Sequence, residues 1–173
     1  YTNSALRLIV RQCAFREKSG LTLTEMTGAV ALDTMRISLP NLHLRTPVSS
    51  LSARMTMDFN AFADIDPGVI NLSLNASLGK QDIMRFMDFV PTGFVRLWPN
   101  RPLTLHGVVN GNMRCANFSG LTMKLPTAFS VRAHGIAYNL NTPNRLRATV
   151  DAEAETYNLA FVTALMPASL NKH

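Results

Sequence analysis

The stretch INLSLNASL, residues 70–78, alternates apolar and polar side chains without a break. Side chains of a β-strand point alternately to its two faces, so this pattern predicts a strand with one apolar and one polar face. The same alternation recurs in LSARMTMDF, residues 51–59, and in LRATVDAEA, residues 146–154. One-sided strands favour an antiparallel sheet, because strands of a parallel sheet are buried on both faces and read as continuous apolar runs.

Shorter alternating runs occupy much of the remaining chain and are separated by Gly, Pro, Asn and Asp clusters, such as residues 18–20, 66–68 and 142–144. These residue types favour turns. Gly107 and Gly111 fall on the apolar side of their run, where glycines mark bulges or a close approach of two backbones. We therefore predict a mostly β fold: a curled, taco-like antiparallel sheet with an apolar concave face.

Two segments depart from the period of two and predict short helices. Residues 81–90 place their apolar side chains on one helical face, and residues 157–166 are apolar on most sides, with Thr156 as the expected N-cap. A proline, Pro91 or Pro167, follows each segment and disfavours further helix.

The same two segments reveal an internal repeat. Residues 70–91 and 146–167 align without a gap, and in each an alternating strand leads into a proline-terminated helix. Repeats of this kind bury their faces against their neighbours. We predict two units, residues 1–91 and the shorter 92–173, within one continuous structural domain.

The composition is rich in apolar residues and poor in charge. Apolar residues make up 47%, charged residues 16%, and the mean hydropathy is +0.08, whereas about a quarter of residues are charged in an average domain. The net charge of +6 comes from dispersed arginines without the aromatic interleaving that binds bases, so we expect no nucleic-acid partner. No apolar run is long enough for a membrane-spanning helix, and with Tyr1 at the start we expect a piece of a longer protein, anchored by a segment outside it.

The sequence predicts no active site, because no base, nucleophile and metal-ligand set has a recognisable spacing. His43, His106 and His134 occupy polar positions of alternating runs and are expected to face solvent. Cys13 and Cys115 are interpreted as buried thiols on strands, with a disulfide between them left open. We expect a protein that is not an enzyme and has no catalytic residues, metal or cofactor.

The apolar face itself is the candidate site. Methionines on it adapt to irregular partners, as an acyl chain requires, although ordinary core packing is the favoured explanation for each methionine taken singly. The predicted lipid-groove residues are Leu51, Met55, Met57, Leu72, Leu74, Leu105, Val109, Leu146 and Val150.

Several motifs resemble the AsmA-like/TamB family of Gram-negative envelope proteins. They are FREKSGL at residues 15–21, LPNLHLRTP at 39–47 with SSL at 49–51, and PLTLHGVVNG at 102–111. The last is similar to the family's P-L-x-L-x-G-x-V-x-G strand. The resemblance extends from about residue 15 to residue 167, and the two predicted helices depart from the family's simple strand array.

The resemblance implies a periplasmic location and a role in lipid transport. Family members are anchored in the inner membrane by an N-terminal helix, extend through the periplasm as an open β-structure, and are thought to carry phospholipid toward the outer membrane. It also implies a possible partner, an outer-membrane barrel of the Omp85 type. This chain is then an internal segment that binds or conducts phospholipid or another acyl lipid between the two membranes.

Two other functions stay open on the sequence alone: a soluble lipid carrier with a closed cavity, and a structural β-repeat stalk or interaction module whose apolar face is dry core. Whichever holds, an open sheet leaves unpaired edge strands, which promote association. We therefore expect the isolated chain to self-associate.

Overall fold

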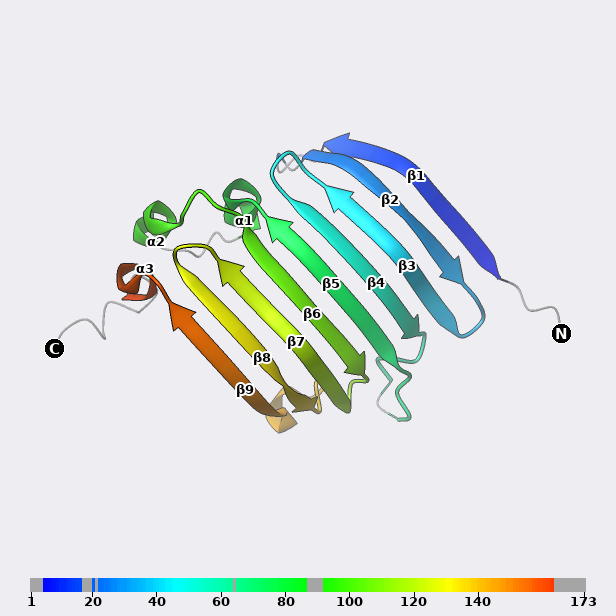
Figure 1. The fold of residues 1–173 in the computed structure, drawn as a ribbon. Helices are drawn as coiled ribbons and strands as arrows, with labels where there is room; N and C mark the ends of the chain where they lie inside the picture. Colours follow the sequence, from blue (N-terminus) through cyan, green and yellow to red (C-terminus); the bar gives the residue numbers. More distant parts are fainter. Residues whose placement is uncertain (1–4, 17–19, 21, 64, 87–91, 164–173) are drawn as a thin grey trace.

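The computed structural model describes residues 5–16, 20, 22–63, 65–86 and 92–163. The described part of the chain is mostly β, with 62% in strands, and its nine strands form one antiparallel sheet that is not closed into a barrel (Figure 1). The strands are β1 (Leu6–Arg16), β2 (Thr22–Leu32), β3 (Arg36–Arg45), β4 (Ser50–Asp58), β5 (Ile70–Leu78), β6 (Leu103–Gly111), β7 (Cys115–Leu125), β8 (Phe129–Tyr138) and β9 (Arg147–Thr156). The predicted fold class is confirmed.

Within the described residues, three short α-helices and one 3₁₀ turn accompany the sheet. They are α1 (Lys80–Phe86), α2 (Thr92–Leu97), η1 (Pro143–Arg145) and α3 (Leu159–Thr163). Both predicted helices are present, but α2 was not predicted. Residues 87–90 and 164–166 of the predicted helices lie outside the described residues. The expected N-cap Thr156 is wrong, because Asn158 precedes α3 and its side-chain oxygen accepts a hydrogen bond from the Phe161 amide at 3.3 Å.

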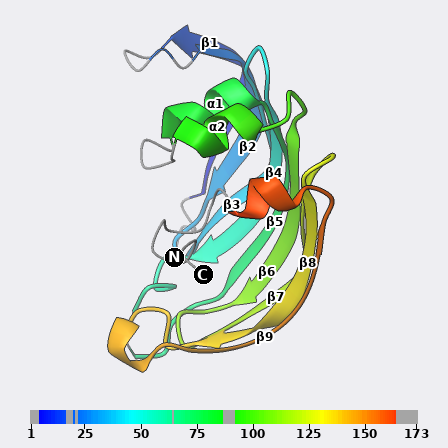
Figure 2. The ribbon, with the colours of Figure 1, turned by 90° about the vertical axis from the view of Figure 1, so that its left-hand side faces the viewer.

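Strand order follows chain order from β1 to β9, so every connection joins neighbouring strands. The central ladders are regular: β4 pairs with β5, and β5 with β6, without a register shift. Shifts occur between other strands, two of them between β1 and β2. Irregular pairing of this kind bends strands and increases their twist, in agreement with the curled sheet in Figure 2.

Gly111 ends β6 in a conformation that only glycine adopts easily. Its φ is +137°, and a Cβ there would lie 2.2 Å from the Cys115 carbonyl oxygen. The predicted close backbone approach at this glycine is therefore confirmed. It allows β6 to turn tightly into β7.

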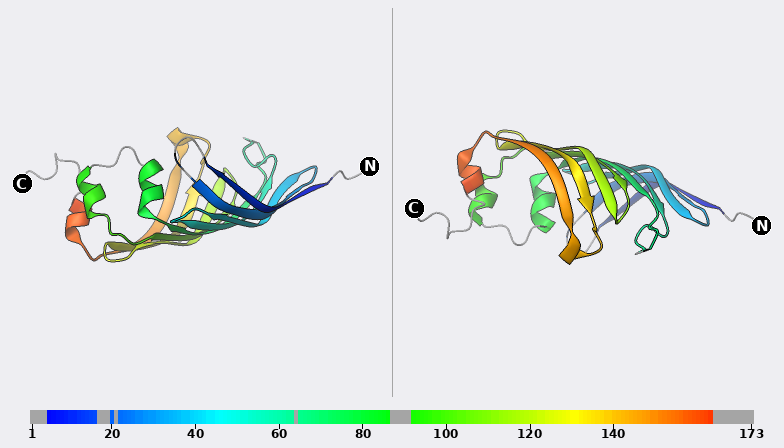
Figure 3. Two further views of the ribbon diagram at one scale, coloured as in Figure 1. Left: turned by 90° about the horizontal axis from the view of Figure 1, so that it is seen from above. Right: turned by 90° about the horizontal axis from the view of Figure 1, so that it is seen from below.

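The helices lie inside the curl, at one end of the strands (Figures 2 and 3). Together with the turn between β7 and β8 they form a small core of Ile83, Trp98, Leu125, Ala128 and Phe161, which packs against Leu78, Leu103 and Phe129. The Trp98 and Phe161 rings meet edge to face with centroids 5.8 Å apart, a favoured aromatic geometry.

The register shows which face of the sheet these helices cover. Leu78 pairs with Leu103, two residues along from the pair of Ala76 with Leu105, so these side chains share the apolar face. The apolar face is therefore the concave one. The boundary between the predicted units 1–91 and 92–173 falls next to residues outside the described ones, and that division stays a prediction.

Candidate functional site

The register brings eight of the nine predicted groove residues onto the concave face. Directly paired residues of an antiparallel sheet project on the same side. Leu51 pairs with Ala76 and Ala76 with Leu105, while Leu74 pairs with Ala53. One row crosses seven strands in succession: Leu39, Met55, Leu72, Val109, Phe118, Gly135 and Val150.

Leu146 is the exception among the nine. It follows the 3₁₀ turn η1 and precedes β9, so it is not part of the ladder between β8 and β9. Its side chain is 52% exposed. The structure places Leu146 at the rim of the sheet, not within the row of paired apolar residues.

The concave face is largely uncovered by other described elements. The groove residues on β4, β5 and β6 are half-buried, and Val150 on β9 is 47% exposed. The chain exposes 12130 Å² of surface, whereas a compact monomer of 19.1 kDa exposes about 8,400 Å². This excess is what a single-layer sheet produces, because a second layer covers its apolar face in an ordinary two-layer domain.

The lining of the face changes from one side of the sheet to the other. Leu and Met side chains predominate on the concave face of β3, β4 and β5. On β8 and β9, two alanine pairs, Ala133 with Ala152 and Ala137 with Ala148, lie on that face. Gly135 continues this trend, and a Cβ at that position would lie 2.3 Å from the Thr149 carbonyl oxygen. The apolar layer is therefore thick over β3–β5 and thin over β8–β9.

A buried carboxylate fixes the helix that covers one end of this face. Asp82 of α1 is 6% exposed and accepts hydrogen bonds from the hydroxyls of Thr46 at 2.5 Å and Ser49 at 2.6 Å. Arg85 contacts its other oxygen at 3.2 Å. The Ser49 hydroxyl in turn accepts a hydrogen bond from the Gly79 amide, so the turn between β3 and β4 holds the start of α1.

Sequence reasoning missed the role of Asp82. The available signal was the run Thr46-Pro47-Val48-Ser49, which predicts a turn and carries part of the family resemblance but does not indicate a contact with a distant helix. In the structure the Thr46 hydroxyl also accepts hydrogen bonds from the amides of Val48 and Ser49, an ST-turn that orients both hydroxyls. The motif thus positions the helix.

The convex face is polar and carries the predicted solvent-facing histidines. His43, Ser52, Asn75 and His106 form one paired row. The imidazole Nδ1 of His43 lies 2.9 Å from the Ser52 hydroxyl, and that of His106 lies 2.6 Å from the Asn75 side-chain oxygen. All three strand histidines are exposed, which confirms the expected orientation.

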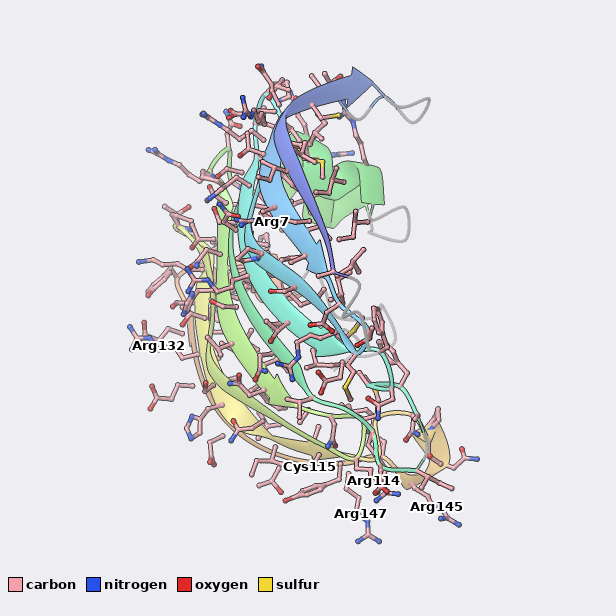
Figure 4. All side chains as sticks on the ribbon, turned by 90° about the vertical axis from the view of Figure 1, so that its right-hand side faces the viewer. Arg7, Arg114, Cys115, Arg132, Arg145 and Arg147 are labelled. Atoms are coloured by element: carbon pink, nitrogen blue, oxygen red, sulfur yellow. The ribbon has the colours of Figure 1, made fainter. Side chains whose placement is uncertain are left out.

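Arginine side chains occupy the outer face and the end of the sheet opposite the helices. Arg132 projects from the convex side, and Arg114, Arg145 and Arg147 gather at the far end (Figure 4). Cys115 lies in the same region. Cys115 and Cys13 are both free and exposed, so the prediction of buried thiols is wrong. Cys13 lies on the irregular edge strand β1, and Cys115 begins β7 at an end of the sheet.

An exposed ion pair joins β3 to β4 at the end away from the helices. Arg36 Nε donates to Asp58 Oδ1 at 2.6 Å, and the Val69 amide donates to the other carboxylate oxygen at 2.9 Å. The Arg36 hydrogen bond, followed by the Val69 amide, lowers the pKa of Asp58 below its usual 3.8. The hydrogen bond to Asp58 and the charge of that carboxylate raise the pKa of Arg36. The pair borders an open hollow of about 650 Å³.

Two further observations concern metals and membranes. The described residues contain no group of three or more His, Cys, Asp or Glu side chains placed to hold a metal ion. Within the same residues, no helix has the length and apolar character needed to cross a bilayer.

Comparison of the chain with models of protein families, with curated proteins and with solved structures finds no match.

Proposed function

We propose that this chain is a non-catalytic β-structured element that binds acyl lipid along its concave face. The observation that carries the proposal is the continuous apolar row from Leu39 on β3 to Val150 on β9, which no second layer of described residues covers. Uncovered apolar surface costs free energy in proportion to its area, about 25 cal/mol per Å². An acyl chain lying along the row removes that surface from water.

The shape and chemistry of the face support a flexible, extended apolar ligand. Met55 and Met57 are half-buried and adapt their side chains to irregular partners. The helical cluster around Phe161 closes only one end of the strands. A ligand can therefore lie across several strands without entering an enclosed cavity. The soluble-carrier alternative requires such a closed cavity, and the sheet is not closed.

The cellular setting is proposed from the resemblance of the motifs alone. We place the chain in an AsmA-like/TamB-type bridge in the periplasm, with phospholipid as the lipid, inner-membrane anchoring by a segment outside this chain, and an Omp85-type barrel as a possible partner. The convex face, with its exposed histidines and arginines, faces water in this arrangement.

The test is native mass spectrometry with lipid extraction on the purified chain. We expect co-purifying phospholipid, lost in Leu72→Asp, which puts a charge in the middle of the apolar row. Asn71→Asp is the matched control, because it introduces the same charge at the neighbouring residue of β5 on the polar face. We expect the control to retain its lipid.

Met55→Gln is a milder change in the same apolar row and replaces Leu72→Asp as the test if that variant does not fold. Circular dichroism measures the β-structure of each variant. Folded wild-type protein that carries no lipid, and takes up none from phosphatidylethanolamine vesicles, would contradict the proposal. That result would favour the stalk or interaction module with a dry apolar face.

A further inference from the structure

Strand β9 presents a long and regular free edge. It is last in the sheet order, so within the described residues only β8 pairs with it. All ten of its residues are exposed, and its pairing with β8 runs from Arg147 to Thr156 without a shift. Proteins commonly protect such edges with bulges, prolines or a covering element, and an unprotected edge is a template for another strand.

The hydrogen bonds between β8 and β9 show which backbone groups face outward. The Tyr157 amide donates to the Ala128 carbonyl, so in this regular ladder the odd-numbered residues of β9 exchange hydrogen bonds with β8. The amides and carbonyls of Ala148, Val150, Ala152 and Ala154 then point to the free edge. Their side chains lie on the concave face.

The polar side chains of β9 are arranged so that the strand complements itself. Basic residues, Arg145 and Arg147, come before Val150, and acidic residues, Glu153 and Glu155, come after it. In an antiparallel pair of two β9 strands centred on Val150, Arg147 of each copy faces Glu153 of the other. Thr149 faces Asp151, and Ala148 faces Ala152. Opposite charges in such cross-strand pairs are stabilising.

Two other pairings of identical edges are less favourable. Moving the centre by one residue to Asp151 places the two Asp151 carboxylates directly opposite each other. Strand β1, the other edge, contains three arginines and no acidic residue, so two β1 strands repel each other. Its pairing with β2 is also interrupted by two register shifts, which make that edge irregular.

We propose that two copies of this chain form a symmetric dimer through antiparallel pairing of their β9 strands, centred on Val150. The two-fold axis runs perpendicular to the sheet, as the isologous interface of a C2 dimer requires. Rotation about this axis keeps both apolar faces on the same side. The dimer is one continuous curled sheet, and its formation does not depend on lipid.

The first test is sedimentation velocity on the full chain with two charge-reversal variants. In the Arg147→Glu homodimer both cross-strand pairs become Glu with Glu, and in the Glu153→Arg homodimer both become Arg with Arg. We expect each variant to raise the dimer dissociation constant by about tenfold or more. An equimolar mixture of the two variants restores both opposite-charge pairs, and we expect it to recover wild-type affinity as a heterodimer. Arg54→Glu, the same charge reversal on the interior strand β4, leaves dimerisation unchanged.

A second test addresses the backbone. Ala152→Pro removes an outward-facing amide that does not bond to β8, and proline is tolerated on an edge strand in that orientation. We expect a folded monomer by circular dichroism and sedimentation, whereas Ala152→Val, which keeps the amide, remains dimeric. A wild-type monomer at about 100 μM, a mixture that fails to recover affinity, or species that grow beyond a dimer with concentration would overturn the proposal.

Discussion

At the scale of single residues, the Asp82 carboxylate connects parts of the chain that are far apart in sequence. Its hydroxyl partners, Thr46 and Ser49, lie 36 and 33 residues earlier. Nothing in a local pattern indicates such a contact, because Asp82 reads simply as an acidic residue in the first turn of a helix. Its burial appears only when α1 folds back over the strand ends.

We expect Asp82→Ala to lower the free energy of unfolding by about 1–3 kcal/mol, because two hydroxyls then lose a charged acceptor in a partly buried place. Urea unfolding followed by circular dichroism measures the change. Gln81→Ala is the matched control on the same helix, since Gln81 is exposed. Equal losses in the two variants would show that Asp82 does not fix α1.

Acid should weaken the link between β3 and β4 at Asp58. The Arg36 contact lowers the pKa of Asp58 in the folded state, so folding favours the ionised carboxyl. Its contribution is fully present above the ordinary value of 3.8 and is lost as the pH falls through the lowered folded value.

Urea midpoints measured from about pH 6 down to about pH 2.5 test this expectation. Wild type should lose more stability over this range than Asp58→Asn, which cannot ionise, whereas Asp66→Asn, in the loop that follows β4, should follow wild type. A wild-type pH profile parallel to that of Asp58→Asn would contradict a lowered pKa.

At the scale of elements, the strands were predictable and the helical cluster only in part. Alternation placed β4, β5 and β9 within a residue or two of their observed bounds, because each of these strands has one apolar and one polar face. Helix α2 has six residues, too few to show a helical period. Trp98 directly follows α2, and its ring packs on the Phe161 ring of α3. No local pattern predicts this contact.

Helix α3 should depend on Phe161. The side chain is completely buried between Trp98 and Phe129, so Phe161→Ala should destabilise the protein by about 3 kcal/mol. Trp98 is the single tryptophan of the sequence, and its fluorescence emission should shift to the red as the cluster loosens. Leu159→Ala, on the exposed side of the same helix, should change neither property, and a matching red shift there would contradict this packing.

At the scale of the whole molecule, the face of eight of the nine groove residues was predictable, but their exposure was not. Period-two alternation predicts that Leu72 and Val109 lie on the same face of the sheet, as their pairing shows. It does not say whether a second layer covers them, since dry core and open groove have the same pattern. The self-complementary charge pattern of β9 could not be interpreted from the sequence either, because it matters for association only if β9 is an edge strand.

The strict neighbour-to-neighbour order of the strands also determines how the sheet responds to force. The first and last strands are the two edges of the sheet, so tension between them loads one hairpin at a time instead of shearing the whole ladder. Each released strand yields a short length of slack, and the strands behind it remain paired. Under pull, the sheet would lengthen in a series of small steps and rewind in the reverse order when the tension relaxes.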